Sequence, residues 1–424
     1  MQRPFPSILI LILVTLLVGG CLNSATQPFR WNWDHTLLQA DSVVTAAIRA
    51  EELAGAVLMV SVQGEIKLLN AYGFARQFAY GGASLPKPTP MTPNHVFDLA
   101  SLTKVFATTF GAMLLVDQEK IALDDPVNMY LPAFSSPSKD SITVRHLLSH
   151  TAGLSPWKPT YYHAENKQET LDYISELELA YPVGQARHYS DLGFMLMGYI
   201  IENISGSSLD AFSHENLYNP LGLTQTGFNP DANLPLVATS HGNPFEKRMV
   251  ADDNFGYECD EDPESFTAWR TRVLLGEVND GNAYHAHGGI AGHAGLFSNA
   301  AELQILLELL LNNGTYRDKE LIKPEVIQTF LTPNNTDNGL GWAMASNVLL
   351  VDDLPPGTFG HTGFTGTYAI AVPAHELSIV LLTNRQHAGV GEDGRYPSIN
   401  DLRRSVVTTV LGAFNSQLDR QSNE

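Results

Sequence analysis

Residues 97–104 read Phe97-Asp98-Leu99-Ala100-Ser101-Leu102-Thr103-Lys104, and Ser101 opens the strongest helical pattern of the chain, which continues to about Gln118. Three residues separate Ser101 from Lys104, so on a helix the hydroxyl and the amine share one face and can meet. A serine becomes a good nucleophile when a base accepts its proton, and a desolvated lysine can be that base. Alone, the motif fits equally a helix N-cap serine beside a solvated lysine.

Two further triplets follow in order, Tyr189-Ser190-Asp191 and His361-Thr362-Gly363. With Ser-x-x-Lys they resemble the motifs of the class C β-lactamases and their relatives, the low-molecular-weight penicillin-binding proteins, D-aminopeptidases and esterases. In that family the elements are Ser-x-x-Lys, Tyr-x-Asn and Lys-Thr-Gly or His-Thr-Gly. Three elements in the required order favour an activated serine over a helix cap.

The resemblance also includes the segments 142–154 (ITVRHLLSHTAGL) and 292–298 (GHAGLFS), and it covers roughly Leu53 to Phe414. It implies an α+β fold of the β-lactamase and transpeptidase type. In that fold an antiparallel sheet is built from both chain ends and flanked by helices, beside an all-helical region. The catalytic site is expected between the two.

Local patterns agree with this arrangement. The sequence predicts a helix over His35–Leu53, paired strands over Ala56–Val62 and Ile66–Leu69, two further strands over 366–372 and 377–382, and a closing helix over Ile399–Phe414. A Gly- and Pro-rich connection is expected over Gly81–Pro93, and long loops in the middle of the chain, including Asn229–Gly256.

The resemblance implies a role for each matching residue. Ser101 would attack the substrate carbonyl, Lys104 would take its proton, and Tyr189 would pass a proton to the leaving group and later activate water. An acyl-enzyme would form on Ser101. The backbone N–H groups of Ser101 and Phe364 would form the oxyanion hole, and Asp191, His361, Thr362 and Gly363 would bind substrate.

Two positions depart from the β-lactamase pattern. Asp191 replaces the usual asparagine, and a carboxylate beside Lys104 would raise the lysine pKa and shift base duty towards Tyr189. His361 replaces the usual lysine; it would be neutral over much of the physiological range and bind a substrate carboxylate less firmly and in a pH-dependent way. Efficient β-lactamase activity is therefore disfavoured.

Tyr-Ser-Asp together with Gly-His-Ala-Gly is most similar to penicillin-binding proteins of the 4B type, described as D-alanyl-D-alanine carboxypeptidases. This resemblance implies a serine acyl hydrolase acting on peptidoglycan peptides. A carboxylic-ester hydrolase of the same family is an alternative that the loss of a lysine at position 361 supports. A catalytically weak cell-wall or penicillin-binding protein is a third reading.

Composition excludes other classes. The 424 residues are 44% hydrophobic and 17% charged, which is enough apolar material for a large core. A formal charge of −20 would repel nucleic acid, so no nucleic-acid partner is expected. No cofactor is expected either.

The N-terminus has the layout of a secretory signal: Arg3, an apolar run over Ile8–Val18, and Gly19-Gly20-Cys21. Small residues before Cys21 resemble the bacterial lipobox, which implies lipidation of Cys21; ordinary cleavage nearby is the alternative. Leu22 follows Cys21 at the position where lipoproteins retained in the inner membrane usually have aspartate, so the resemblance favours the outer membrane. We therefore expect a protein anchored by lipid on the periplasmic face of a bacterial membrane. The predicted organisation is a signal peptide (1–20), a tether (21–34), a hydrolase domain (35–416) and a polar tail (417–424).

The remaining histidines and cysteine are given structural roles. His285, His287 and His293 stand close together, but a glycine-rich stretch gives metal ligands no rigid frame, so a loop at the rim of the site is preferred to a zinc site. His146 and His150 are read as hydrogen-bonding residues of a structural segment. Cys259 lies in an acidic stretch that would raise its thiol pKa, so a catalytic role is disfavoured.

Overall fold

The computed structural model describes residues 33–255, 257 and 259–421. The predicted signal peptide, Cys21 and nearly all of the tether lie outside these residues. Within the described ranges, no helix combines the length and the apolar character that crossing a membrane requires.

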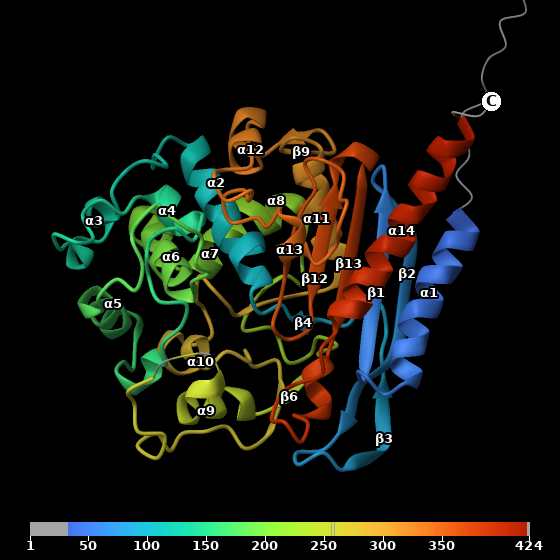
Figure 1. Ribbon diagram of the computed structural model, residues 1–424, viewed down its shortest axis with the longest axis horizontal. Helices are drawn as coiled ribbons and strands as arrows, with labels where there is room; N and C mark the ends of the chain where they lie inside the picture. The colour runs from blue at the N-terminus through green and yellow to red at the C-terminus, as the bar shows by residue number, and fades with distance from the viewer. Residues whose placement is uncertain (1–32, 256, 258, 422–424) are drawn as a thin grey trace, which may run out of the picture. The chain divides into compact units, whose positions relative to one another are not determined.

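A six-stranded antiparallel sheet joins the two ends of the chain (Figure 1). Its strand order is β11-β12-β13-β1-β2-β3. The strands are β1 (Gly55–Val62), β2 (Glu65–Phe78), β3 (Ser84–Pro90), β11 (Phe359–Thr362), β12 (Tyr368–Val372) and β13 (Leu377–Thr383). The central pair is β1 with β13, in a register that sets Ala56 opposite Thr383 and Val62 opposite Leu377. The prediction of a sheet built from both chain ends is confirmed.

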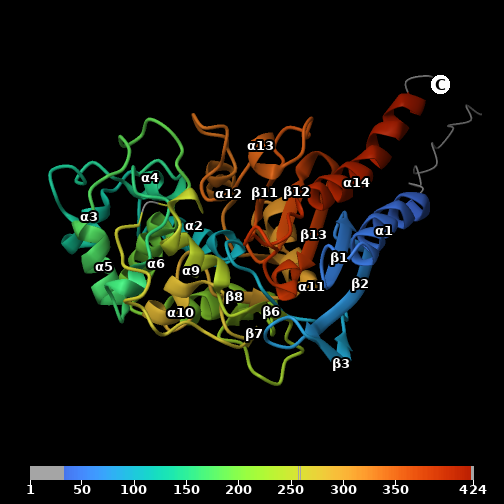
Figure 2. The same ribbon diagram turned by 60° about the horizontal axis from the view of Figure 1, so that its bottom comes forward.

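The two central strands are mostly apolar because both of their faces are covered. Every residue of β1 and β13 is buried, although successive side chains of a strand point to opposite faces. Helices α1 (Trp33–Arg49) and α14 (Asn400–Gln421) pack against each other and run along the sheet, side by side in both views (Figures 1 and 2). Helix α11 (Ala300–Leu311) packs on β1, β12 and β13.

A mostly helical region lies beside the sheet (Figure 2). Its longest helix, α6 (Asp191–Ser205), begins at Ser190, whose side chain accepts a hydrogen bond from the Gly193 N–H, and ends at Gly206 in the left-handed conformation (φ 71°). The other elements of this region are η1 (Lys104–Thr109), α2 (Phe110–Asp117), α3 (Val127–Tyr130), η2 (Pro132–Phe134), α4 (Val144–Leu148), η3 (Thr160–Tyr162), α5 (Lys167–Glu176), α7 (Leu209–Ser213), η4 (His214–Tyr218) and α8 (Asn219–Leu221).

Shorter elements complete the chain. They are β4 (Phe97–Asp98), β5 (Gly227–Phe228), β6 (Ala238–His241), α9 (Pro244–Ala251), η5 (Asp253–Phe255), β7 (Val273–Leu275), α10 (Gly281–His287), β8 (Leu296–Ser298), β9 (Thr315–Tyr316), β10 (Lys319–Glu320), α12 (Pro324–Phe330), α13 (Ser346–Leu349), η6 (Pro373–His375) and η7 (Arg385–Ala388). Strand β8 pairs with both β4 and β5, which ties the segment before Ser101 to the segment after Gly292. This small sheet positions the site.

Three expectations are corrected. The Gly- and Pro-rich connection contains the edge strand β3, where prolines are tolerated because one side of the strand needs no ladder hydrogen bonds. The segment expected as a long loop, 229–256, contains β6 and α9. Helix α14 continues to Gln421, into the segment predicted as a polar tail (417–424).

The helix after Ser101 also differs from a regular α-helix. Its first part, η1, is π-helical, and α2 follows it directly. The Thr109 hydroxyl donates to the Lys104 carbonyl at 2.7 Å, five residues back, and so binds a carbonyl that a widened turn leaves accessible. Such wide turns are frequent at functional sites.

Candidate active site

Ser101 follows a tight turn whose backbone is held on several sides. Ala100 has a left-handed backbone (φ 47°), which is unusual for a residue with a side chain. Its N–H donates to the buried Asp98 carboxylate at 2.9 Å, and the Leu99 carbonyl accepts from the Thr367 hydroxyl at 2.9 Å. One contact within the turn and one from the segment after β11 thus fix a strained turn, a feature found where a reactive side chain must be presented.

Lys104 is fully buried and its ammonium has three partners. The nitrogen lies 3.0 Å from Ser101 Oγ, 3.1 Å from the His293 carbonyl oxygen and 2.7 Å from Asp191 Oδ1. Burial alone would lower the pKa of Lys104, but the charge of Asp191, aided by Tyr189, outweighs burial and raises this pKa above its ordinary value. The lysine is therefore an ammonium ion at neutral pH.

Asp191 owes its place to the start of α6. It is the first residue of that helix, where the backbone dipole favours a negative charge. Its N–H donates to the Pro156 carbonyl at 2.9 Å, which holds the helix start against the neighbouring loop. The carboxylate of Asp191 thus raises the pKa of Lys104, which is the effect expected from the sequence.

The ring of Tyr189 lies beside the Lys104 ammonium. Its ring lies 4.5 Å from the His150 ring and 4.9 Å from Lys104 Nζ, both measured to the Tyr189 centroid. Burial raises the pKa of Tyr189; the Lys104 charge and hydrogen bonds from Lys104 and Ser101 oppose it without cancelling it. At neutral pH the phenol keeps its proton, beside a charged lysine and a serine hydroxyl.

A Tyr189→Phe variant removes only the phenolic oxygen. We expect kcat to fall by about 10²- to 10⁴-fold, the usual contribution of a positioned proton-transfer group, with the fold intact. Steady-state kinetics on any substrate that the parent turns over, alongside thermal melting, would measure this. An unchanged kcat would show that Tyr189 takes no part in proton transfer.

His361 lies at the end of β11 and is buried. Its Nδ1 is 2.7 Å from the Thr362 carbonyl oxygen, and its ring centroid is 6.0 Å from that of Tyr189. Burial, followed by the charge of Lys104, lowers the pKa of His361 to about 3. The expectation of pH-dependent substrate binding within the physiological range is therefore corrected, because this imidazole stays neutral there.

This neutrality can be measured directly. We expect the Cε1–H resonance of His361 to hold its position from pH 8 down to about pH 4, because the pKa is about 3. Comparison of ¹H–¹³C spectra with those of a His361→Gln variant assigns the signal. A titration with its midpoint near the ordinary histidine value of about 6.5 would contradict the burial argument.

The turn after β11 brings the third motif against the first. A side chain on Gly363 would lie 2.5 Å from the Leu99 carbonyl oxygen and 1.9 Å from Thr367 Oγ1, so only glycine fits. Phe364 follows, and Arg385 donates to its carbonyl at 2.7 and 3.0 Å. Among the described residues, neither the Ser101 nor the Phe364 N–H has a hydrogen-bond acceptor, as an oxyanion hole requires.

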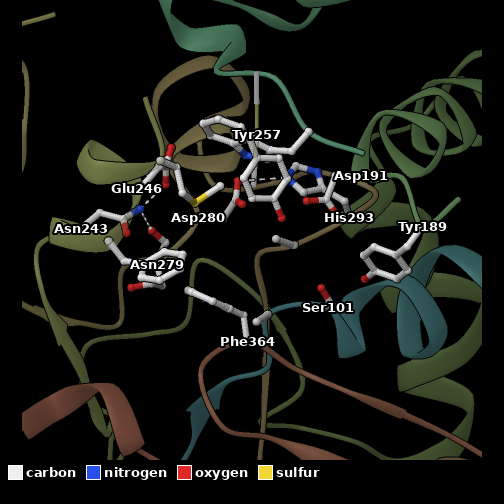
Figure 3. A pocket seen from close by; sticks show the side chains of 15 residues that line it. Ser101, Tyr189, Asp191, Asn243, Glu246, Tyr257, Asn279, Asp280, His293 and Phe364 are labelled. Carbon is white, nitrogen blue, oxygen red and sulfur yellow. Dashed lines mark hydrogen bonds and ion pairs between the residues drawn. The ribbon is translucent and has the colours of Figure 1, made fainter. Parts of the chain in front are cut away.

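Ser101 opens into a cavity of about 150 Å³. Figure 3 shows Ser101 and Tyr189 at one end of this cavity and Asn243, Glu246 and Asn279 at the other, with Asp280 between them. The lining residues are Ala100, Ser101, Trp157, Tyr189, Asp191, Asn243, Phe245, Glu246, Met249, Tyr257, Asn279, Asp280, His293, Ala294 and Phe364. His361, Thr362 and Gly363 are not among these lining residues.

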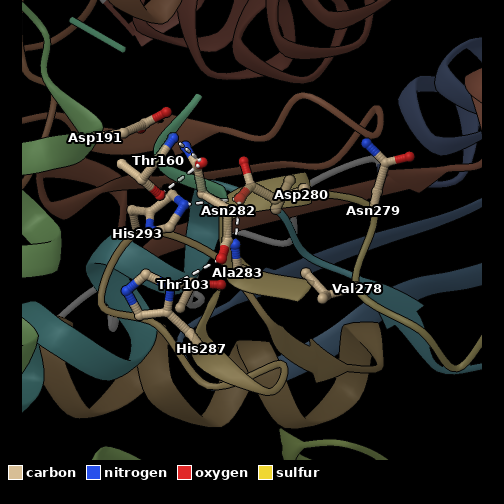
Figure 4. Close-up of polar contacts among 12 residues, drawn as sticks. Thr103, Thr160, Asp191, Val278, Asn279, Asp280, Asn282, Ala283, His287 and His293 are labelled. Atoms are coloured by element: carbon tan, nitrogen blue, oxygen red, sulfur yellow. Dashed lines mark hydrogen bonds and ion pairs between the residues drawn. The ribbon is translucent and has the colours of Figure 1, made fainter. Parts of the chain in front are cut away.

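Sequence reasoning named His293 but missed the other polar groups on the far side of the cavity. His293 Nε2 and Asp280 Oδ1 are 2.9 Å apart, and Asp280 also caps α10 by accepting from the Ala283 N–H at 2.8 Å (Figure 4). Burial alone would raise the pKa of Asp280, but His293 outweighs it and holds this pKa below its usual range. The pair Asn279-Asp280, which stands just before α10, could have indicated the helix cap in the sequence. The sequence of α9 contains no motif that would have singled out Glu246.

The histidine cluster divides. His293 lines the cavity, whereas His287 is buried between the Tyr199 hydroxyl (2.6 Å) and the Asn282 carbonyl (2.8 Å), and His285 lies outside the lining. The expected rim loop is corrected in part, because its first residues form α10. In the described part of the chain, no group of three or more His, Cys, Asp or Glu residues is arranged to hold a metal.

The histidines of the 142–154 segment have structural partners. His146 completes a capping box with Thr143 at the start of α4. His150 Nδ1 accepts from the Ser190 N–H at 3.0 Å, which fixes the residue between Tyr189 and Asp191. Cys259 is partly buried against the aromatic cluster around Trp157 and Tyr161, and it is not among the cavity lining.

Several known proteins resemble this chain in sequence. The sequence model of the family described as "Beta-lactamase" matches residues 40–403. An "N-acetylmuramyl-L-alanine amidase" of Bacillus subtilis (strain 168) is 35% identical over 403 residues, 91% of this chain and 88% of that protein. A "Putative D-alanyl-D-alanine carboxypeptidase" of Escherichia coli (strain K12) is 32% identical over 372 residues, 83% of each chain.

Solved structures share the fold. "EstCE1, a hydrolase with promiscuous acyltransferase activity" superposes with a TM-score of 0.64 at 22% identity, covering 89% of this chain and 98% of that one. The octameric penicillin-binding protein homologue from Pyrococcus abyssi superposes with a TM-score of 0.61 at 20% identity, covering 89% and 77%. The predicted α+β fold is confirmed.

Proposed function

This chain belongs to the β-lactamase family of serine hydrolases, and we propose that it cleaves an amide bond in peptidoglycan-type peptides through an acyl-enzyme on Ser101. One observation carries the proposal. Ser101 Oγ lies 3.0 Å from an ammonium that Asp191 holds at 2.7 Å, in the wall of a cavity and after a strained turn. This arrangement presents a hydroxyl for attack and supplies positive charge where negative charge develops.

The charge states define the proton path. Lys104 is an ammonium and has no lone pair to accept a proton, whereas the Tyr189 oxygen can accept one proton while it donates another. In acylation, Ser101 Oγ bonds to the carbonyl carbon, its proton passes to Tyr189, and the Tyr189 proton passes to the leaving nitrogen. The C–N bond then breaks. The Lys104 ammonium stabilises the negative charge that develops on Ser101 Oγ and on the Tyr189 oxygen.

Deacylation runs the same path with water. A water molecule gives its proton to Tyr189 as it attacks the ester carbonyl, and Tyr189 returns a proton to Ser101 Oγ, which leaves. The N–H groups of Ser101 and Phe364 receive the carbonyl oxygen in both steps. No cofactor enters this scheme.

The direct test offers purified muropeptides to the soluble protein. We expect mass spectrometry to show an amino compound released from one of two bonds: terminal D-alanine from a stem ending in D-Ala-D-Ala, or the stem peptide from an N-acetylmuramoyl amide. The products must be absent with Ser101→Ala. Hydrolysis of simple esters without hydrolysis of either amide would reject the proposal in favour of a carboxylic-ester hydrolase.

The muramoyl amide is a second candidate that a specific observation favours. A carboxypeptidase must bind the terminal carboxylate of its substrate, and a lysine or protonated histidine at position 361 would supply the charge. Here His361 is neutral, and no lysine or arginine is among the described residues that line the cavity. The B. subtilis relative is named for cleavage at a muramyl residue.

We further propose lipidation of Cys21 and residence on the periplasmic face of a bacterial membrane, the outer membrane being favoured. The support is the signal-like sequence 1–21 and the cell-wall names of the relatives. Intact mass of the protein purified from membranes, compared with a Cys21→Ser variant, tests this. A mature chain that begins elsewhere and carries no lipid would reject it.

A further inference from the structure

The end of the cavity opposite Ser101 is built from α9 and the segment before α10. Asn243, Glu246 and Asn279 meet there, next to the Asp280–His293 pair (Figure 3). Asn279 Oδ1 accepts from the Ser240 hydroxyl at 2.6 Å, which orients its amide nitrogen away from that contact. We call this group of three residues the Glu246 end. It takes no part in the proton path described above.

Glu246 is 5% exposed and only half satisfied. Its Oε2 accepts from the Gly281 N–H at 2.9 Å and from the Asn243 side-chain amide, whereas its Oε1 has no hydrogen-bond partner among the described residues. The Tyr161 hydroxyl is near enough to lower the pKa of the carboxyl, but it does not meet hydrogen-bond geometry. A buried oxygen without a partner is costly, so a ligand is the expected partner in a cavity wall.

The acidic side chains of this cavity either lie beside a basic side chain or have a raised pKa. Asp191 is paired with Lys104 at 2.7 Å and Asp280 with His293 at 2.9 Å. Burial, and then the charge of Asp280, raises the pKa of Glu246 to about 8, so this carboxyl is mostly neutral at pH 7. A carboxyl with a raised pKa and two amides offer hydrogen-bond donors and acceptors, so a ligand bearing uncharged hydroxyl and amide groups fits this end of the cavity.

Flat apolar surfaces flank these polar groups. Trp157, Phe245, Tyr257 and Phe364 all line the cavity. The Phe245 and Phe364 rings are 5.2 Å apart and the Trp157 and Tyr257 rings 5.3 Å apart, centroid to centroid. A ligand with both apolar ring faces and a polar edge would use the aromatic walls and the amide and carboxyl groups together.

We propose that the Glu246 end binds an uncharged sugar ring bearing hydroxyl and N-acyl groups, on the acyl side of the bond that Ser101 cleaves. The inference rests on the proposed function and deepens it, because it selects the muramoyl amide over the D-alanyl terminus. Glu246 and the two asparagines bind the polar edge of the ring, and the aromatic walls bind its faces.

Binding to the soluble form that starts at Asn23, carrying Ser101→Ala, separates this inference from catalysis. The probes are N-acetylmuramoyl-L-alanine and N-acetyl-D-alanyl-D-alanine, titrated by calorimetry. We expect Glu246→Leu to lower the affinity for the sugar probe by at least about tenfold, because one or two buried hydrogen bonds are lost. The affinity for the peptide probe should not change. Glu246→Gln keeps a donor and an acceptor and should retain most of the affinity for the sugar probe.

Glu277→Leu is the matched control, because Glu277 pairs with Arg272 outside the cavity lining. Equal sugar affinity in the Glu246 and Glu277 variants, or equal weakening of both probes, would overturn the inference. If Glu246→Leu does not fold, saturation-transfer NMR on the Ser101→Ala protein decides: transfer must be strongest at the sugar ring protons, and transfer concentrated on the alanyl methyl contradicts it. Failure of the proposed function would instead show as absent hydrolysis by the parent protein.

Discussion

Replacing Ser101 by alanine is expected to lower hydrolysis by at least about 10⁴-fold, because removal of the nucleophile of an acyl hydrolase leaves only binding and oxyanion stabilisation. The covalent adduct with a penicillin should disappear at the same time. The fold should be unaffected, since Lys104 Nζ, which donates to Ser101 Oγ at 3.0 Å, keeps its pair with Asp191.

Intact mass measures this result most directly. The soluble form starting at Asn23 is incubated with a penicillin, beside Ser101→Ala and the exposed-serine control Ser138→Ala. An adduct in the parent and in Ser138→Ala, but not in Ser101→Ala, establishes the nucleophile. An adduct that survives in Ser101→Ala would place acylation on another residue and reject the assignment.

Replacing Asp191 by asparagine is expected to have the second largest effect, on both stability and pH dependence. Lys104 is fully buried, and loss of the partner of a buried charge typically costs about 3–5 kcal/mol. The folded pKa of Lys104 is raised, so the pair stabilises below the unfolded value of about 10.4 and this stability is lost as pH rises through the folded pKa. The stability deficit of the variant should therefore be full at pH 7.

Urea unfolding at pH 7 measures the deficit, with Asp401→Asn as the control. Asp401 pairs with Arg404 on the exposed side of α14, where an ion pair contributes about 1 kcal/mol or less. A deficit no larger than that of the control would show that Lys104 does not depend on Asp191 for its charge.

The same variant restores the Tyr-x-Asn pattern. With the carboxylate gone, burial becomes the dominant influence and lowers the pKa of Lys104, so a neutral amine becomes available to take the Ser101 proton. We expect acylation by penicillin to become faster and its pH optimum to move. An unchanged acylation rate and pH profile would mean that the lysine never acts as the base.

The sequence correctly predicted those features that depend on residues close together in the chain. The apolar runs 56–62 and 377–382 are buried strands, and the spacing of Ser101 and Lys104 brings their side chains into contact. Sequence predicted that His361 is largely neutral, but not that burial lowers its pKa to about 3, because burial is not visible in the sequence. Glu246 was invisible because its neighbours in the cavity come from distant segments, and α9 is too short for a periodic pattern. The π-helical turn after Ser101, in which the Thr109 hydroxyl binds the Lys104 carbonyl, is not predicted by helical periodicity.

The central pairing of β1 with β13 also bears on how the chain folds. Ala56 and Thr383 are register partners from opposite ends of the protein, so the middle of the sheet cannot close until nearly the whole chain is available. Long-range pairings of this kind slow folding, because loop-closure entropy is lost before the contacts form. A chain truncated before Leu377 lacks a central strand rather than an edge strand, and it should leave the hydrogen-bonding edge of β1 unpaired and prone to aggregation.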